Sequence, residues 1–237
     1  MSFYEKLSQY YDIIFPLNQK SVDFINERVN KGSILDLGAG TGNHALALAK
    51  LGHKVTATDL DKYMIDKVIE KAVANDIAIE AIQLPMEQIE LLNGRSFSTI
   101  ICLGNSLVHL KDFDEVIQVI NNTYLLLPKN GKLFIQIVNY DRVLHDGVTE
   151  LPIIKRDEEE LTFKRTYKHH DNKIIFQGLL TVGKQTFKNE VSLLPITSDQ
   201  LEIILKKAGF TSILKYGSYK AEVFSLHSPA IIIEATK

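Results

Sequence analysis

Hydrophobic residues between positions 21 and 140 follow two alternating patterns. Short, continuously apolar runs are typical of strands buried on both faces of a sheet, and apolar residues at every third or fourth position are typical of amphipathic helices. The predicted strands are residues 33–38, 54–59, 77–84, 97–105 and 131–140, and the predicted helices are residues 21–30, 44–52, 61–76 and 113–127. This order predicts βαβ units and an α/β fold, with helices on both faces of a mostly parallel, doubly wound sheet.

The pattern changes after residue 150. Residues 161–182 alternate apolar and polar positions, which predicts an antiparallel pair of strands turning at residues 170–172. A third strand is predicted over residues 184–194, whereas the charged run KRDEEE at residues 155–160 predicts a solvated loop. This segment is too short to bury a core of its own, so we interpret it as a sheet inserted over the α/β core.

The end of the chain predicts a helix and two closing strands. The helix is expected over residues 195–210, with Thr197 or Ser198 as its N-cap and Gly209 at its end. The strands are expected at residues 211–217 and 228–236. We therefore divide the chain into an N-terminal lid segment with a helix (1–30), an α/β core (31–149), an inserted antiparallel β lid over the substrate (150–195) and a C-terminal helix and strands that complete the core sheet (196–237).

Composition and charge narrow the class of protein. The 237 residues carry a formal net charge of −2, which argues against a dedicated nucleic-acid-binding or membrane-surface protein. Cys102 is the single cysteine, so an intrachain disulfide and a four-cysteine zinc site are excluded, and its apolar surroundings predict a buried small residue. No signal-peptide pattern and no membrane-length apolar run is present. We expect a cytoplasmic protein, either monomeric or homo-oligomeric.

The segment ILDLGAGTGNH, residues 34–44, joins the first predicted strand to the next helix. It contains Gly38, Gly40 and Gly42, which allow a tight turn and a close approach of backbone N–H groups to a ligand. Asp59 ends the second strand, and an acid there can accept both hydroxyls of a ribose. The carboxyl ends of neighbouring parallel strands are where ligands bind in such sheets. The pair of motifs therefore predicts a nucleoside site.

Two residues of this region favour one nucleoside ligand over another. A dinucleotide loop requires Gly or Ala where this chain has Asn43. Asp36 would repel a pyrophosphate but would suit a ligand with positive charge. A ligand with adenosine, an ammonium, a sulfonium and no phosphate fits these observations, and that ligand is S-adenosyl-L-methionine.

The stretch LDLGAGTGNHALALAKLGHKVTATDLD resembles motifs I and II of the class I S-adenosylmethionine-dependent methyltransferases. The resemblance implies a seven-stranded Rossmann-like sheet with an antiparallel C-terminal hairpin. It also implies that the backbone of Gly38, Ala39 and Gly40 contacts the methionine and ribose parts of the cofactor. In the same way, Asp59 would bind the ribose hydroxyls and Leu60 would pack on adenine.

Three further residues are assigned to the cofactor. Asp36 and Asn43 flank the glycine loop and are expected to contact it. Many relatives carry an acid near the end of the third strand that meets the adenine amine, but this chain reads QLPME there. We therefore expect Met86 to pack on adenine, with Glu87 as a weaker candidate.

The stretches IICLGNSLVHLKD and NYDRVL are similar to the glycine and sarcosine N-methyltransferase branch of this family. This similarity implies that Leu103 and Asn105 face the cofactor and the acceptor, with His109 further along. Glycine-methylating relatives carry an arginine immediately before NYD, where this chain has Val138. Because an arginine fork is hard to replace in carboxylate binding, glycine itself is not the expected acceptor.

Methyl transfer requires alignment of donor and acceptor and the exclusion of water. Tyr11, in the N-terminal segment LSQYYDIIFP, is expected to lie over the cofactor, or else it only packs this segment down. Asn105 is the candidate for positioning the acceptor. His109 is the candidate base for a hydroxyl acceptor, with a capping role as the alternative. His44 is predicted to cap the helix after the glycine loop, and the histidine spacings predict no metal site.

Three functions are compared at this point. The leading one is an S-adenosylmethionine-dependent methyltransferase acting on a nitrogen or oxygen of a small-molecule acceptor. The first alternative is a non-catalytic module that binds the same cofactor. An NAD-dependent oxidoreductase on a similar sheet is less favoured because of Asp36 and Asn43.

Overall fold

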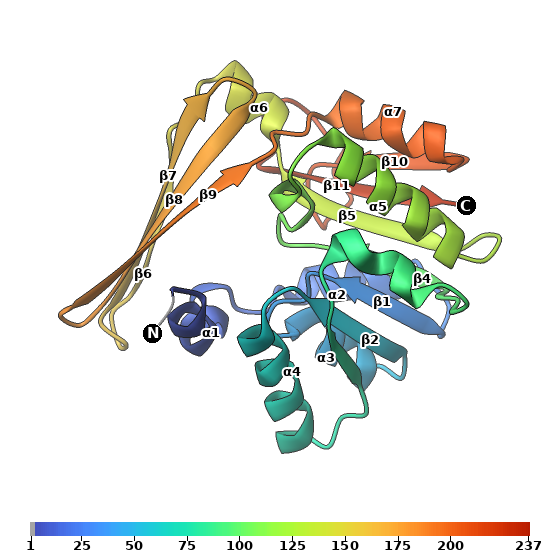
Figure 1. The fold of residues 1–237 in the computed structure, drawn as a ribbon, viewed down its shortest axis with the longest axis horizontal. Helices are drawn as coiled ribbons and strands as arrows, with labels where there is room; N and C mark the ends of the chain where they lie inside the picture. Colours follow the sequence, from blue (N-terminus) through green and yellow to red (C-terminus); the bar gives the residue numbers. More distant parts are fainter. Residues whose placement is uncertain (1–2) are drawn as a thin grey trace.

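The computed structural model describes residues 3–237, and their side chains from residue 7 onward. Within this part of the chain the helices are α1 (Phe3–Ile14), α2 (Gln19–Asn26), α3 (Asn43–Lys50), α4 (Lys62–Ala74), α5 (Phe113–Leu126), α6 (Tyr140–His145) and α7 (Ser198–Ala208), together with the 3-10 helices η1 (Met86–Leu92) and η2 (Leu107–His109). The strands are β1 (Ser33–Leu37), β2 (Lys54–Asp59), β3 (Glu80–Gln83), β4 (Thr99–Cys102), β5 (Lys132–Val138), β6 (Glu150–Arg156), β7 (Leu161–His170), β8 (Lys173–Val182), β9 (Gln185–Leu193), β10 (Ser212–Tyr216) and β11 (Ala230–Thr236). They form two separate sheets (Figure 1).

The central sheet has seven strands in the order β10-β11-β5-β4-β1-β2-β3. Five neighbouring strands of this sheet, β3, β2, β1, β4 and β5, are parallel. β11 lies between β5 and β10 and is antiparallel to both. This confirms the predicted α/β sheet with an antiparallel closing pair. From β1 the chain adds β2 and β3 on one side, and it then crosses back to place β4 on the other side of β1. The strand order therefore reverses between β1 and β4, and the carboxyl ends of these two strands border the crevice in which such sheets bind ligands.

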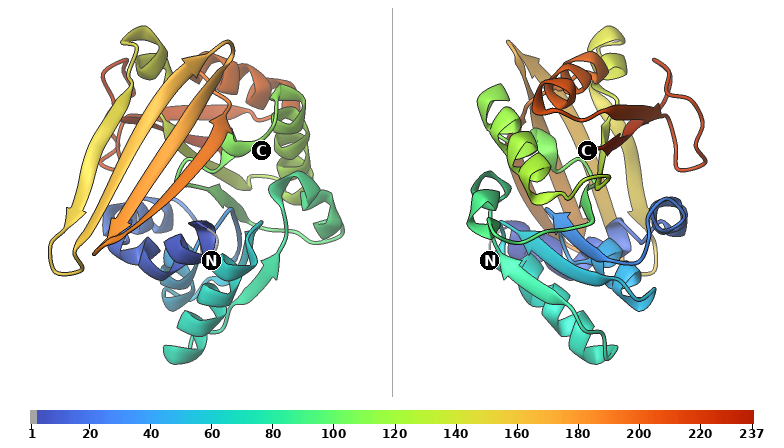
Figure 2. Two further views of the ribbon diagram at one scale, coloured as in Figure 1. Left: turned by 60° about the vertical axis from the view of Figure 1, so that its left-hand side comes forward. Right: turned by 90° about the vertical axis from the view of Figure 1, so that its right-hand side faces the viewer.

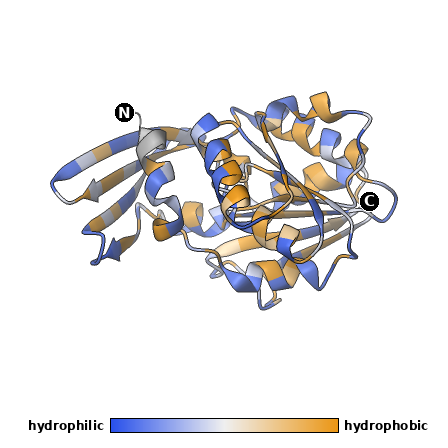
Figure 3. Ribbon diagram, turned by 90° about the horizontal axis from the view of Figure 1, so that it is seen from below, coloured by the Kyte–Doolittle hydropathy of each residue, from blue (hydrophilic) through white to orange (hydrophobic). Residues whose placement is uncertain are grey.

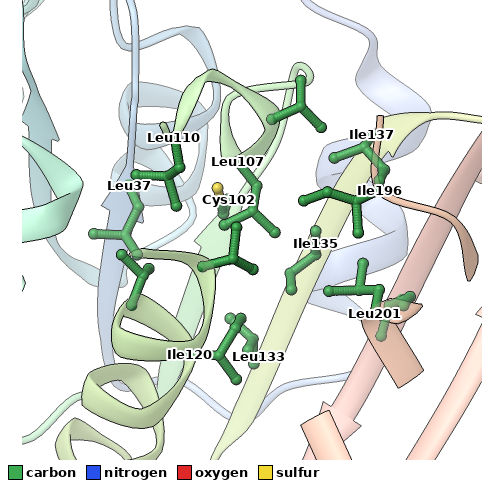
Figure 4. Packing of buried hydrophobic residues seen from close by; sticks show 14 of the residues in the cluster. Leu37, Cys102, Leu107, Leu110, Ile120, Leu133, Ile135, Ile137, Ile196 and Leu201 are labelled. Atoms are coloured by element: carbon green, nitrogen blue, oxygen red, sulfur yellow. The ribbon is translucent and has the colours of Figure 1, made fainter. Parts of the chain in front are cut away.

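Two apolar layers hold the helices against the central sheet. One layer contains alternate residues of β1, β4 and β5 with the apolar sides of α5 and α7. In Figure 4, Leu37, Ile120 and Ile135 are among the labelled residues of this layer, and all three are almost fully buried. The other layer packs the opposite face of the sheet against α2, α3 and α4. Cys102 lies in the first layer and is buried, as predicted.

The second sheet consists of β6, β7, β8 and β9, all antiparallel (Figure 2). Its strands alternate hydrophobic and hydrophilic residues, as Figure 3 shows. The sequence did not predict β6, and the start of KRDEEE belongs to this strand instead of a loop. The reason is a register shift between Leu151 and Ile154, beside Pro152, which breaks the alternation on an edge strand.

Local capping contacts decide where several elements begin. Asn18 caps α2, because its side chain accepts a hydrogen bond from the N–H of Lys20. The predicted fifth strand stops early, since Asn139 caps the unpredicted helix α6. Thr197 caps α7 in a capping box, and Gly209 ends it, as predicted. No helix in residues 3–237 is long and apolar enough to span a bilayer.

Helix α1 lies between the two sheets. Leu7 and Ile14 of α1 pack with Met64 of α4 and with Phe163 and Leu180 of the second sheet. Arg156 of β6 donates from Nε to the carbonyl oxygen of Ile13, at 2.9 Å. The helix therefore connects the second sheet to the side of the central sheet on which the strands end and the glycine loop lies.

Candidate functional site

The glycine loop turns sharply at the carboxyl end of β1. Gly38, Gly40 and Gly42 have positive φ angles of 68°, 56° and 79°, a conformation that favours glycine. A Cβ atom on Gly38 would lie 2.8 Å from the side chain of Ser106, and one on Gly42 would lie 2.8 Å from that of Val68. The loop therefore needs glycine both for its conformation and for the space around it.

Asp59 is held beside this loop by backbone donors. Its carboxylate accepts hydrogen bonds from the N–H of Gly40 at 2.8 Å and from the N–H of Asp61 at 2.9 Å. Burial raises the pKa of Asp59, and these two hydrogen bonds oppose that rise. Leu60 follows directly and is 65% exposed, so an apolar side chain stands open to solvent next to the acid.

Asp36 is the buried acid of the site. Its side chain is on β1 and the residue is only 3% exposed. Burial, followed by repulsion from Asp59, raises the pKa of Asp36 to about 7. A buried carboxylate of this kind is stabilised by a cation brought in with a ligand.

Tyr11 of α1 lies directly on the glycine loop. Its ring would be 3.3 Å from a Cβ on Gly40, and its centroid is 5.2 Å from that of Phe15. Burial and the nearby carboxylates of Asp59, Asp12 and Asp36 raise the pKa of Tyr11 to about 12. The hydroxyl therefore stays protonated at neutral pH, and it can donate a hydrogen bond.

A polar cluster, here called the Asp12 cluster, fastens α1 to the loop. Asp12 accepts hydrogen bonds from Thr41 at 2.5 Å and from Asn43 at 2.9 Å, and it pairs with Lys71 of α4 at 2.7 Å. Lys71 also donates to the side-chain oxygen of Asn43, at 2.6 Å. Both polar atoms of the Asn43 side chain are thus engaged by α1 and α4. Its expected contact with the cofactor stays a prediction.

Asn105 lies in the turn after β4, in a left-handed conformation with a φ of 71°. Its side-chain oxygen accepts from the N–H of Val138 at 2.9 Å, and its amide nitrogen donates to the hydroxyl of Tyr140 at 3.2 Å. Ser106 donates to the carbonyl oxygen of Gly38, at 3.2 Å. The turn after β4 is therefore tied both to the glycine loop and to the end of β5.

Two tyrosines extend this connection to the second sheet. Tyr140 is fully buried and is hydrogen-bonded to Tyr167 of β7 as well as to Asn105. Burial raises the pKa of both tyrosines, so both hydroxyls are neutral. The sequence did not single out Tyr140, because nothing in the run NYDRVL distinguishes a buried hydrogen-bonding tyrosine from a core residue.

The remaining predicted residues are spread around the loop. Met86 begins η1, and its methyl carbon would be 3.4 Å from a Cβ on Gly38. Leu103 is buried in the layer facing α2 and α3. His109 is exposed at the end of η2. His44 does not cap α3 by its side chain: Gly42 is the N-cap, and His44 contacts Ser21 of α2 at 2.7 Å.

Comparisons with known proteins agree with this geometry. Residues 34–131 match a family model described as a methyltransferase domain. The chain is 25% identical to a glycine/sarcosine N-methyltransferase of Aphanothece halophytica, over 86% of this chain and 75% of the relative. It is 28% identical to a glycine/sarcosine N-methyltransferase of Halorhodospira halochloris, over 84% and 73% of the two chains. The fold is shared with a S-adenosylmethionine-dependent methyltransferase from Clostridium acetobutylicum ATCC 824, at a TM-score of 0.84, 20% identity and 98% coverage of each chain.

Proposed function

Because the chain is a class I S-adenosylmethionine-dependent methyltransferase, we propose that it transfers the methyl group to a nitrogen atom of a small-molecule acceptor. The observation that carries this proposal is the neutral hydrogen-bonded chain of Asn105, Tyr140 and Tyr167. The acids Asp36 and Asp59 do not belong to this chain of hydrogen bonds and lie near the ends of β1 and β2. The names of the two curated relatives, both N-methyltransferases, support the same choice.

We assign the cofactor to the crevice beside the glycine loop. Asp59 would accept the two ribose hydroxyls, and the exposed Leu60 would cover one face of the adenine. The ammonium group of the cofactor would neutralise Asp36, whose burial disfavours its charged form. Tyr11 would then lie over the methionine part, with its hydroxyl protonated and able to donate to the bound molecules.

The reaction needs no strong base when the acceptor is a neutral amine. The nitrogen lone pair forms the new bond to the methyl carbon while the bond from carbon to sulfur breaks. The electron pair stays on sulfur, which gives S-adenosylhomocysteine, and the methylated ammonium then loses a proton to water. Asn105 would orient the acceptor for this in-line step, and the buried Tyr140 would hold Asn105 in place through their hydrogen bond.

A hydroxyl acceptor would require a general base. His109 is the candidate for that role, and partial desolvation lowers its pKa, which keeps its ring neutral at pH 7. It is nevertheless exposed at the end of η2. A neutral amine needs no such base, so the dependence of transfer on His109 distinguishes the two classes of acceptor.

The test combines binding and transfer on one preparation. Thermal unfolding is measured with S-adenosylmethionine, S-adenosylhomocysteine, NAD and buffer, and a ligand at about 100 times its Kd should add about 2.7 kcal/mol. Formation of S-adenosylhomocysteine is then followed with small amines and with the alcohols of matching carbon skeleton. We expect turnover of amines by the native chain and by His109→Gln alike.

Two outcomes would contradict the proposal. Turnover of alcohols alone, lost in His109→Gln, would assign the acceptor to oxygen. Cofactor binding without transfer to any member of the panel would favour a non-catalytic binding module. Mass spectrometry of the denatured protein identifies any product that stays bound and would hide the thermal shift.

A further inference from the structure

The dipeptide Asn-Gly occurs twice in the chain, at residues 93–94 and at residues 130–131. The first pair directly follows η1, and the second lies between α5 and β5. In such a pair the backbone nitrogen of the glycine can reach the side-chain carbonyl carbon of the asparagine, because glycine has no Cβ atom to obstruct the approach. The two pairs therefore carry the same latent chemistry, and the structure decides which of them can use it.

Hydrogen bonds hold the backbone of the second pair. The N–H of Gly131 donates to the carbonyl oxygen of Pro128 at 2.9 Å, and Gly131 is buried. The N–H of Asn130 donates to the carbonyl oxygen of Lys237 at 3.0 Å, and the N–H of Lys237 donates to the carbonyl oxygen of Gly131, also at 3.0 Å. The nitrogen of Gly131 is therefore fixed in position and its hydrogen is engaged.

The first pair is open. Asn93 and Gly94 are both exposed, and the backbone of Asn93 is extended, with a φ of −55° and a ψ of 140°. A Cβ atom on Gly94 would have no atom within 4 Å. Within residues 7–237, neither the N–H of Gly94 nor the side chain of Asn93 has a hydrogen-bond partner. The nitrogen and the carbonyl carbon are thus both free to approach each other.

We propose that Asn93 is a site of spontaneous deamidation and isoaspartate formation in the folded chain, and that the fold protects Asn130 from the same reaction. The backbone nitrogen of Gly94 loses its proton to water and forms a bond to the Cγ atom of Asn93. The bond from Cγ to the side-chain nitrogen breaks, and this nitrogen takes a proton from water and leaves as ammonia.

The product of this step is a cyclic imide, which water then opens. Attack of water at Cγ breaks the new bond and gives aspartate at residue 93. Attack at the backbone carbonyl carbon breaks the original peptide bond and gives isoaspartate, in which the main chain runs through the former side chain. The net reaction consumes one water and releases one ammonia, and nothing is oxidised or reduced.

Isoaspartate at residue 93 would lengthen the main chain by one carbon atom between two fixed points. Leu92, just before it, is buried in the core. Arg95, just after it, donates to the hydroxyl of Thr56 at 2.9 Å and pairs with Glu80. The reaction would therefore change the connection from η1 to the edge of the central sheet, and each event would add one negative charge.

The experiment compares the two asparagines within one chain. The native protein is kept in mildly alkaline buffer, once folded and once in urea, and mass spectrometry of separate peptides follows conversion at Asn93 and Asn130 over days. Electron-transfer fragmentation distinguishes isoaspartate from aspartate. In urea we expect similar rates at both sites. In the folded chain Asn93 should keep most of its rate, whereas Asn130 should react about tenfold more slowly or less, because its hydrogen bonds must open first.

Two matched variants locate the reaction. Asn93→Gln keeps the amide but places it one methylene further away, so ring closure is disfavoured, and this variant should lose most of the isoaspartate of the folded chain. Asn130→Gln makes the same change in the protected pair and should leave the yield of isoaspartate nearly unchanged.

The outcomes decide the proposal without reference to methyl transfer. Slowing of Asn93 by folding to the same extent as Asn130 would overturn it, and so would a native yield of isoaspartate in folded Asn93→Gln. Fast conversion of Asn130 in the folded chain would show that its hydrogen bonds give no protection. Each of these results would leave the proposed methyl transfer untouched.

Discussion

Asp36 is a buried acid whose ionisation lowers the stability of the folded chain. The folded chain binds a proton at this residue more tightly than the unfolded chain, because burial raises its pKa from 3.8 to about 7. Stability therefore falls as pH rises from about 4 to about 7, by at most about 4 kcal/mol in total. Above that range the ligand-free protein retains the full cost of the buried charge. A bound ammonium group would offset it.

This predicts opposite effects of Asp36→Asn on stability and on binding. At about pH 8 the ligand-free variant should be more stable than the native chain, because the buried charge is gone. Its affinity for S-adenosylmethionine should fall about tenfold or more, since the partner of the ammonium is lost. Urea unfolding and calorimetric titration measure the two quantities.

The pH profile provides the internal check. Affinity of the native chain should weaken as pH falls below about 7, by up to tenfold per unit, and Asp36→Asn should lose this part of the dependence. Asp66→Asn, an exposed acid paired with Lys62 on α4, should behave like the native chain. Unchanged affinity of Asp36→Asn would remove Asp36 from the cofactor site.

Residues of the site differ in how far the sequence could predict them. Gly38, Gly40 and Asp59 follow from local patterns, because a loop and a strand end fix their positions. Asp12 and Lys71 were not predicted, because their contacts join segments that are far apart in the chain. Tyr167 was on a predicted strand, but alternation alone does not tell which face of a strand is buried.

At the scale of elements, α1 depends on the Asp12 cluster for its position over the loop. The ion pair between Asp12 and Lys71 is half-exposed, with side-chain exposures of 43% and 25%. Such pairs contribute only about 1 kcal/mol or less to folding. Their effect on a helix that covers a ligand can be larger, because opening of one helix costs much less than unfolding the whole chain.

Asp12→Asn should therefore change ligand exchange more than stability. We expect a loss of about 1 kcal/mol or less in global stability, and dissociation of S-adenosylhomocysteine about 3- to 10-fold faster. Surface plasmon resonance measures the dissociation rate. Lys62→Gln breaks an exposed ion pair on α4 away from α1 and should leave that rate unchanged. An equal rate in Asp12→Asn would show that α1 does not limit ligand release.

The elements that were missed have a common cause. The central strands were predicted because each is a continuous apolar run buried on both faces. β6 was missed because a register shift hides its alternation, and α6 because Asn139 turns the chain within what reads as one apolar run. In both places the local geometry of one residue, a bulge in β6 and the cap Asn139 before α6, decides the secondary structure against the hydrophobic pattern of the neighbouring residues.

On the scale of the whole molecule, the two sheets are connected through α1 and Tyr167. α1 packs on β7 and β8, and Arg156 of β6 donates a hydrogen bond to its backbone. Tyr167 of β7 is hydrogen-bonded to Tyr140, the first residue of α6, just after β5. A ligand that fills the site should therefore stabilise the second sheet as well as the glycine loop.

Hydrogen exchange tests this connection. Binding of S-adenosylhomocysteine should slow exchange about tenfold or more in α1 and in β7, as well as in residues 38–42. Helix α7 packs on α5, away from the loop, and serves as the internal reference with no expected change. Protection confined to residues 38–42 and the end of β2 would show that the second sheet does not respond to the cofactor.

The position of β11 has a consequence for how the chain is made. β5 is an apolar strand, and β11 covers one of its two edges. Residues 139–229 lie between these strands, so a growing chain must complete the whole second sheet before that edge is paired. Until then β5 is an open edge of the kind that recruits other chains into aggregates. The strand that covers this edge of β5 is thus synthesised only after all four strands of the second sheet.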